Sequence, residues 1–157
     1  MNFQEKLFLA GLGSGFLPKA PGTWGTLVGL VSGVAILAYF PLETLFLLTI
    51  LIFLFGVRMT NVYEVRTGIH DDSRIVVDEI AGIWLALCIS GTAPVAAILS
   101  FIFFRIYDIW KPSIIGRIDR DAPGGWGVMG DDLIAGIAAG LSSALVMEGL
   151  NHYHILG

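Results

Sequence analysis

Residues 75–90 read IVVDEIAGIWLALCIS, an apolar run of helical length that contains the adjacent acids Asp78 and Glu79. Four further apolar segments lie along the chain, at about 24–40, 42–57, 94–109 and 132–150. Several fall slightly short of the roughly 20 residues that a helix needs to cross a bilayer. We therefore expect a bundle of about five hydrophobic helices, in which the segments at 75–90 and 94–109 are short or tilted.

The composition indicates that lipid is the surrounding medium. The chain has 157 residues, of which 55% are hydrophobic and 14% are charged, whereas soluble domains carry roughly 25% charged residues. A protein of this size cannot bury so much apolar surface in its own core. No basic tract suggests a nucleic acid, and nothing suggests an obligate protein partner. We predict an all-α, polytopic membrane helix bundle that forms a single domain, residues 1–157.

The basic residues distinguish two possible topologies. If all five segments cross the membrane, the nine Lys and Arg residues share one side with the N-terminus, together with all thirteen acids except Glu43 and Glu148. A single long span over 75–109 would instead move four basic residues to the other side: Arg105, Lys111, Arg117 and Arg120. Because basic loops face the cytoplasm, we predict five helices and a cytoplasmic N-terminus. Gly and Pro interrupt residues 1–22 too early for a signal-peptide core, so no cleavage is expected.

Small residues recur at helical spacing in two of the segments. Gly25, Gly29 and Gly33 lie four residues apart in one, and Gly136 and Gly140 do so in another. This spacing lets helix backbones approach closely in lipid, so we expect these faces to be packed. In the last segment Asp132 belongs to the same helical face, which predicts that its carboxylate points into the bundle.

Two acidic pairs are expected at one membrane face. Each ionised carboxylate at membrane depth costs roughly 2.5–3.5 kcal/mol, so Asp78 and Glu79 need neutralisation. Carboxylate oxygens suit Mg²⁺ or Mn²⁺, and Asp131 with Asp132 would supply a second pair of ligands. The alternative is that both pairs stabilise helix N-termini, where negative charge is favoured. For Asp78 and Glu79 the preceding apolar residues indicate that the helix has already begun, which favours the metal.

Cationic residues near the same face could bind a phosphate group. Arg105, Asp108 and Lys111 follow one another at i, i+3 and i+6, so Asp108 could orient a cation that holds phosphate. The alternative is interfacial snorkelling with a local ion pair. Thr23 could cap the first helix, whose amide end could bind an anion. His70 and Asp71 could add a base or a ligand, or could be ordinary solvated loop residues.

Four ordered stretches of the chain resemble the phosphatidylglycerophosphatase A family. They are GLGSGFLPKAPGTWGTL (11–27), HDDSRIVVDEIAGIW (70–84), FRIYDIWKPSIIGRIDR (104–120) and GGWGVMGDDLIAG (124–136). The resemblance runs from about Gly11 to Gly140 and includes both acidic pairs. It departs from the family after Lys111-Pro112, where members often have Trp-Pro and this chain has Ser113-Ile114.

The resemblance implies a bacterial inner-membrane enzyme that needs Mg²⁺ and hydrolyses phosphatidylglycerol phosphate to phosphatidylglycerol and inorganic phosphate. The resemblance marks Arg105 and Lys111, which would contact the phosphate. From the sequence alone, Thr23 is a further candidate for that contact, with His70 and Asp71 as possible additions. The acids would be catalytic, and all except Asp108 would also bind metal: Asp78, Glu79, Asp108, Asp131 and Asp132.

Which carboxylate is the base stays open, as does a covalent phosphate on Asp108. Two rival functions fit the sequence less well. A CDP-alcohol phosphatidyltransferase normally carries a DGxxAR pattern, which is absent here. A small ion-binding transporter would have polar residues staggered through the bilayer, whereas the middles of these segments are nearly free of charge.

Overall fold

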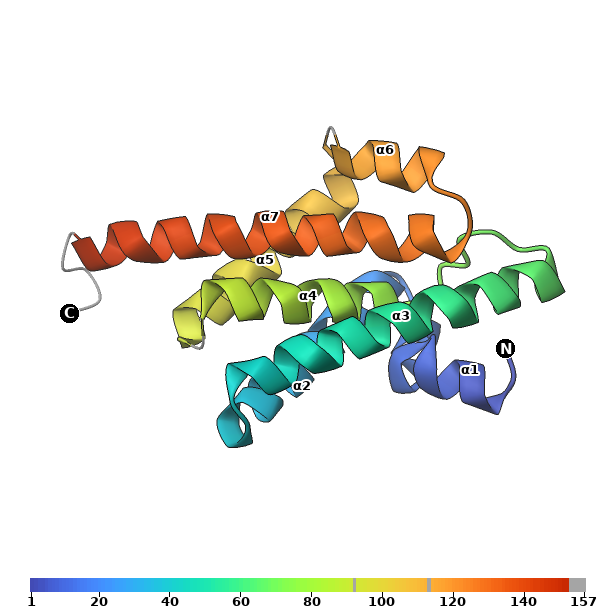
Figure 1. Ribbon diagram of the computed structural model, residues 1–157, viewed down its shortest axis with the longest axis horizontal. Helices are drawn as coiled ribbons and strands as arrows, with labels where there is room; N and C mark the ends of the chain where they lie inside the picture. Colours follow the sequence, from blue (N-terminus) through green and yellow to red (C-terminus); the bar gives the residue numbers. More distant parts are fainter. Residues whose placement is uncertain (92, 113, 153–157) are drawn as a thin grey trace.

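The computed structural model describes residues 1–91, 93–112 and 114–152, which form helices and no strand. Figure 1 shows the elements in chain order. They are α1 (Phe3–Phe8), η1 (Gly11–Phe16), α2 (Pro21–Tyr39), α3 (Leu42–Thr67), α4 (Val77–Ser90), α5 (Pro94–Trp110), α6 (Ile114–Asp121) and α7 (Gly125–His152). The predicted all-α class is confirmed, and each of the five expected apolar segments forms a helix.

The structure corrects several expected boundaries. Helix α3 continues past residue 57 to Thr67, and α7 begins at Gly125 rather than near residue 132. The short elements α1, η1 and α6 were not anticipated. The alternative single span over 75–109 is wrong: α4 ends at Ser90, Gly91 follows with φ +89°, and α5 starts with Pro94 at its first position. Pro94 preorganises a new helix start and cannot donate an N–H to a continuing helix.

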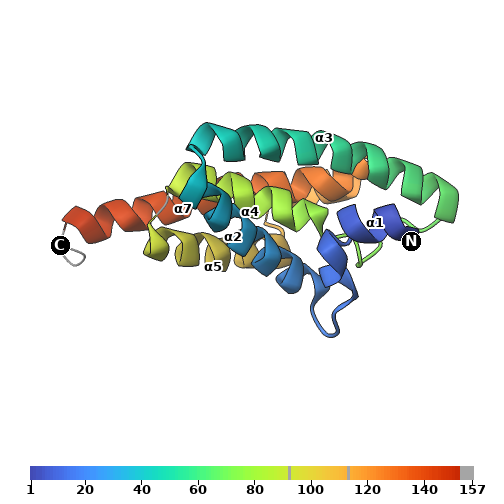
Figure 2. The same cartoon turned by 90° about the horizontal axis from the view of Figure 1, so that it is seen from below.

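Helix α4 lies at the centre of the bundle. It packs against α7, α2, α3 and α5, and α2 and α3 pass beside it in Figure 2. The predicted close packing is present in α2. A Cβ on Gly25 would crowd Val76, and a Cβ on Gly29 would crowd Ile80 and Ile83. Small residues thus let α2 approach α4 almost backbone to backbone, as expected where helices associate in lipid.

Within the described part of the chain, three helices are long and apolar enough to cross a membrane: α2 with 19 residues, α3 with 26 and α7 with 28. Only 28% of the most apolar window of each is buried, so most of their apolar side chains face outward. Such a surface is compatible with lipid and not with water. The chain is therefore a membrane protein. Helices α4 and α5 have 14 and 17 residues, which agrees with the expectation that these two are short.

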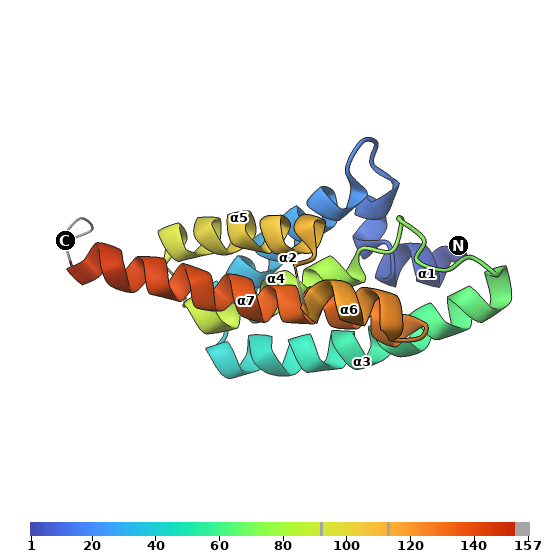
Figure 3. The ribbon, with the colours of Figure 1, turned by 90° about the horizontal axis from the view of Figure 1, so that it is seen from above.

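The connections alternate between the two ends of the bundle. Figure 1 shows the α2–α3 and α4–α5 turns and the end of α7 on the left, and the N-terminus and the α3–α4 connection on the right. Figure 3 shows α6 lying against α7 toward the latter end. This arrangement gathers the starts of α4 and α2 and the end of α5 around the first turns of α7.

Candidate functional site

A polar cavity of about 250 Å³ opens where these helix ends meet. It is lined from five parts of the chain: the start of α2, the α3–α4 connection, the start of α4, the end of α5 and the first turns of α7. The lining residues are Ala20, Pro21, Gly22, Asp71, Ser73, Ile75, Asp78, Glu79, Arg105, Asp108, Ile109, Lys111, Val128, Asp131 and Asp132. Nearly all of the charged residues selected from the sequence are therefore brought together.

Asp78 and Glu79 enter the cavity from the first turn of α4. The helix begins at Val77, one residue before Asp78, so the acids follow the helix start as expected but still lie within its first turn. Asp78 is 8% exposed, and its Oδ1 accepts a hydrogen bond of 3.0 Å from the backbone N–H of Glu79. The helix N-terminus therefore stabilises these carboxylates in part. Residues Ile75 to Val77 precede them as buried apolar residues that hold this end of α4 in the bundle.

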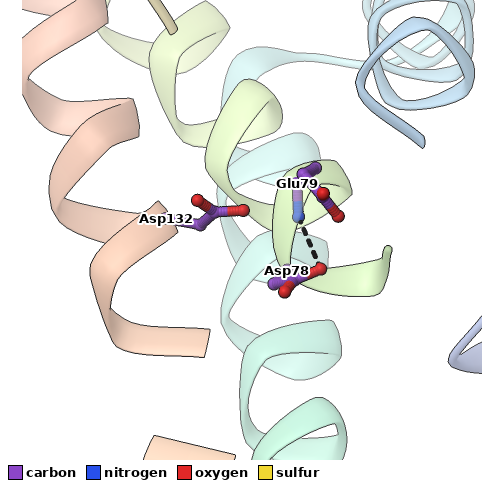
Figure 4. Close-up of side chains that lie close together, drawn as sticks. All are labelled: Asp78, Glu79 and Asp132. Atoms are coloured by element: carbon purple, nitrogen blue, oxygen red, sulfur yellow. Dashed lines mark hydrogen bonds between the residues drawn. The ribbon is translucent and has the colours of Figure 1, made fainter. Parts of the chain in front are cut away.

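Asp132 faces these two acids from α7. It is 3% exposed, and Figure 4 shows its side chain extending from α7 toward α4. Ligand oxygens of Asp78, Glu79 and Asp132 lie within 4.8 Å of one another. Because α7 begins seven residues before Asp132, at Gly125, the acid cannot act as a helix cap. The predicted inward direction of its carboxylate is confirmed.

Asp131 lies beside this group but turns to a different partner. Its Oδ2 accepts a hydrogen bond of 2.7 Å from Nζ of Lys111, and its side chain is almost completely buried. Lys111 is the C-terminal cap of α5 and has a left-handed backbone, φ +44° and ψ +55°. That conformation ends the helix and lets Lys111 reach α7. The three carboxylates that could share one cation do not include Asp131.

Arg105 and Asp108 form an ion pair on the last turns of α5, as their spacing predicts. Both side chains are 15% exposed, and Nη1 of Arg105 also donates to Oγ1 of Thr26 at 3.3 Å. The Nε atom of Arg105 is buried and has no hydrogen-bond partner among the described residues. Asp108 and Thr26 thus hold the Arg105 side chain in the cavity, and its Nε–H can still donate to another acceptor.

Of the remaining predicted residues, one lies in the cavity and two do not. Asp71 lines the cavity, whereas His70 is exposed and its Nδ1 lies 2.7 Å from Oε1 of Glu64. Thr23 does not line the cavity and does not cap α2: the N-cap is Ala20, and no side chain caps that helix end. Pro21 occupies the first turn instead, where its missing N–H is tolerated. Ser113, the point of departure from the family pattern, lies outside the described residues.

Apart from apolar residues of the cavity wall, sequence reasoning missed Gly22 and Ser73, which line the cavity, and Thr26, which bonds Arg105. A Cβ on Gly22 would overlap Oε1 of Glu79 and lie 3.2 Å from Nη1 of Arg105, so a larger residue there would displace the ends of these two side chains. Thr26 is fully buried and bonds both Gly22 O, at 2.7 Å, and Arg105. Gly22 and Thr26 lie on the same face of α2 as Gly25, a face for which the sequence predicts only close packing. The polar Thr26 on this face of small residues was the signal that it also contributes to the site.

The α3–α4 connection is fixed by a polar network of Tyr63, Asp72 and Arg74. The hydroxyl of Tyr63 donates to Oδ2 of Asp72 at 2.5 Å, and Nε of Arg74 donates to Oδ1 at 2.8 Å. The hydrogen bonds from Arg74 hold the pKa of Asp72 well below its usual range, against the opposing effect of burial. The network holds residues 72 and 74, and Asp71 and Ser73 beside them therefore keep their places in the cavity wall.

The donor set fits a hard divalent cation. Six acids and two cations line the cavity, so the site has an excess of negative charge when all are ionised. Oε2 of Glu79 is buried and has no hydrogen-bond partner among the described residues. Buried charges are normally paired or bound to metal, and an all-oxygen site suits Mg²⁺ or Mn²⁺. Asp78, Glu79 and Asp132 are the residues that could hold such an ion.

Comparison with known proteins places the chain among lipid phosphatases. The family model described as Phosphatidylglycerophosphatase A matches residues 7–147. The Phosphatidylglycerophosphatase A of Haemophilus influenzae is 37% identical over 134 residues, 85% of this chain and 82% of the relative. The one from Escherichia coli is 35% identical over 154 residues, 96% of this chain and 86% of the relative.

A third relative carries a different name. A protein of Bacteroides thetaiotaomicron, named as a candidate phosphatidylinositol-3-phosphatase, is 36% identical over 143 residues, 87% of this chain and 89% of its own length. No solved structure matches the chain. The matched region contains every residue that lines the cavity. By its sequence over nearly its whole length, this chain belongs to the phosphatidylglycerophosphatase A family of phosphatases.

Proposed function

We propose that this protein hydrolyses phosphatidylglycerol phosphate to phosphatidylglycerol and inorganic phosphate in a Mg²⁺-dependent reaction. The observation that carries the proposal is the single cavity in which Asp78, Glu79 and Asp132 converge beside Arg105 and Lys111. Phosphoryl transfer needs positioning and charge stabilisation more than covalent chemistry. A cluster of carboxylates next to two cations supplies the groups for both.

The carboxylates would hold the ion, and its positive charge would allow an anionic substrate to enter the cavity. Asp78, Glu79 and Asp132 would be its ligands, and Mg²⁺ when bound would offset the negative charge of the phosphoryl oxygens and favour attack by water. Without a cation, the acids of the cavity would repel a phosphate monoester. Oε2 of Glu79, which has no hydrogen-bond partner in the described part of the chain, supports this assignment.

The cations would hold the phosphate. Arg105 has its Nε buried without a partner among the described residues, and its orientation is fixed by Asp108 and Thr26. Lys111 would supply a second positive charge from the same cavity wall, oriented by Asp131. Water exclusion would come from Ile75, Ile109 and Val128, the apolar residues of the cavity wall. The base that takes a proton from the attacking water would be one of the cavity carboxylates.

A phosphate-release assay tests this function directly. The protein, purified in detergent, is given phosphatidylglycerol phosphate with Mg²⁺ and with excess chelator. Phosphatidylinositol-3-phosphate is the competing substrate, because one relative is named for that headgroup. Release from phosphatidylglycerol phosphate alone, and only with the divalent cation, is the expected result. Preferred release from the inositol lipid would contradict the substrate assignment, and equal release in chelator would contradict the metal.

The cavity is proposed to face the cytoplasm at the bacterial inner membrane. The end of the bundle that contains it also contains the basic residues, as the positive-inside rule requires. Cysteines introduced at Ile69 and Arg117, in a Cys88→Ser background, should both resist an impermeant reagent in intact cells. Labelling of either position from outside would contradict the orientation.

A further inference from the structure

Two further cavities lie between α1 and α3, away from the carboxylates. The larger is an apolar groove of about 460 Å³. It is lined by Gln4, Leu7, Phe8, Leu51, Ile52, Phe55 and Met59. None of these residues lines the carboxylate cavity. The groove runs along α3, a helix long and apolar enough to cross the membrane, and Leu51 and Phe55 are 54% and 59% exposed on its surface.

The smaller cavity, of about 230 Å³, continues this groove into a polar region. The two share Gln4, Phe55 and Met59. The smaller one is also lined by Asn2, Glu5, Arg58, Val62 and Arg66. The apolar groove therefore ends at a group of charged side chains. A phospholipid has the same arrangement, with apolar acyl chains joined to a charged headgroup.

The charged end has an excess of positive charge. Glu5 is buried and neutralised by Arg66, whose Nη2 lies 2.6 Å from Oε1 of Glu5. A capping box between Asn2 and Glu5 fixes this acid in place. Arg58 is exposed and makes no ion pair or hydrogen bond with any described residue. Its guanidinium is therefore available to an anion from outside the chain, and guanidinium geometry suits phosphate.

We propose that the groove between α1 and α3 binds one anionic phospholipid, with its phosphate at Arg58 and an acyl chain along Leu51 and Phe55. Basic pockets beside membrane helices on the cytoplasmic side are a known chemistry for anionic headgroups. Lipid is the occupant favoured by the position of the groove, because its walls include the lipid-exposed face of a candidate spanning helix. The bound lipid would hold α1 against α3 and is separate from the lipid that reacts.

Retention of lipid in native mass spectrometry tests the proposal. The protein in detergent is mixed with phosphatidylserine or phosphatidylcholine of identical acyl chains; neither carries a phosphate monoester. Phosphatidylserine should be retained about fivefold better, since one cation near an anionic headgroup contributes about 1 kcal/mol. Equal retention of the two lipids, or no retention of either, would overturn the proposal.

Two substitutions and their matched controls locate the site. Arg58→Gln should remove the preference for phosphatidylserine, whereas Arg117→Gln, an exposed arginine on α6, should keep it. Leu51→Trp should fill the groove and lower retention of both lipids. Leu54→Trp, at a position 52% exposed on the same helix but outside the groove, should not.

All four variants should still release phosphate from the lipid substrate, because none of these residues lines the carboxylate cavity. That activity shows that a variant is folded. If active Arg58→Gln keeps the wild-type preference, or if Leu51→Trp and Leu54→Trp retain lipid equally, the groove does not bind the lipid.

Discussion

The backbone of Gly136 in α7 packs directly on the carbonyl oxygen of Gly82 in α4, so that a Cβ on Gly136 would overlap that oxygen. A Cβ on Gly82 would in turn lie 2.6 Å from the carbonyl oxygen of Asp132. Asp78 and Asp132 each lie four residues before one of these glycines, on the same helix side. The glycine contact therefore sets how closely the carboxylates of the two helices approach.

Adding a methyl group at this contact should separate the carboxylates. Gly136→Ala should destabilise the protein by about 1–3 kcal/mol, the usual cost of overpacking, and raise the Mg²⁺ concentration needed for half-maximal phosphate release. Gly149→Ala is the matched control on the same helix, because no atom lies within 4 Å of a Cβ placed there. Thermal unfolding in detergent and a Mg²⁺ titration are the measurements. Equal behaviour of the two variants would show that the glycine contact does not position the site.

Substitution of Arg105 should lower kcat/KM, whereas substitution of Asp132 should raise the Mg²⁺ requirement. Arg105→Lys keeps the charge but loses the planar fork, so kcat/KM should fall on the order of 100-fold, the scale seen when one preorganised donor is removed. Its Mg²⁺ requirement should hardly change. Asp132→Asn should instead raise that requirement by at least about tenfold, since even outer partners of metal sites contribute roughly 10–100-fold.

Both variants must first be shown to be monodisperse in detergent. If they shift the Mg²⁺ requirement equally, Arg105 orients a metal-binding carboxylate and does not hold the substrate.

Asp131 offers a test between two roles, metal ligand and partner of Lys111. The hydrogen bond of 2.7 Å to Lys111 favours the second role. Asp131→Asn should then lower kcat/KM about tenfold, as loss of an orienting partner does, without changing the Mg²⁺ requirement. Lys111→Gln should produce a similar defect, and the double variant should be little worse than either single one. A clear rise in the Mg²⁺ requirement of Asp131→Asn would restore it to the metal ligands.

The sequence indicated the charged site more fully than it indicated the helix ends. Paired acids in apolar segments are costly in lipid, so Asp78, Glu79 and Asp132 were conspicuous. The expected start of the last helix, near residue 132, is too late because hydrophobicity marks the membrane core and not the first turns: the glycine-rich run before Asp131 is helical from Gly125. Packing against α3 explains this, since a Cβ on Gly125 would overlap Val57 O.

Other contacts of the site had no local sequence signal. Thr26 and Arg105 form a hydrogen bond although they are 79 positions apart in the sequence. Lys111 reaches Asp131 only because its backbone is left-handed. Such contacts depend on how the helices cross, which periodicity does not give. Thr23 was chosen by its nearness to the helix start, whereas the chain caps that end with backbone alone at Ala20.

The network around Asp72 should make the α3–α4 connection sensitive to acid. Because hydrogen bonds from Arg74 hold the pKa of Asp72 below its usual range, the stability it contributes is present above the unfolded pKa of about 3.9 and is lost as pH falls below that value. Asp72→Asn should remove about 1–2 kcal/mol, since Arg74 is partly exposed and water screens its charge.

Unfolding measured from pH 7 down to pH 3 checks this expectation. The difference in stability between wild type and Asp72→Asn should shrink at the acid end. A difference that is constant with pH, or none at pH 7, would show that the ion pair does not stabilise the connection.

Binding of Mn²⁺, followed by electron paramagnetic resonance on the purified protein, tests most directly whether Asp78, Glu79 and Asp132 form a divalent-cation site. Mn²⁺ accepts the same oxygen ligands as Mg²⁺ and gives a signal without substrate. We expect saturable binding to the wild type, competed by Mg²⁺, that weakens by on the order of tenfold or more in a monodisperse Glu79→Gln variant. Equal Mn²⁺ affinity in the two proteins, or no binding to the wild type, would contradict this expectation.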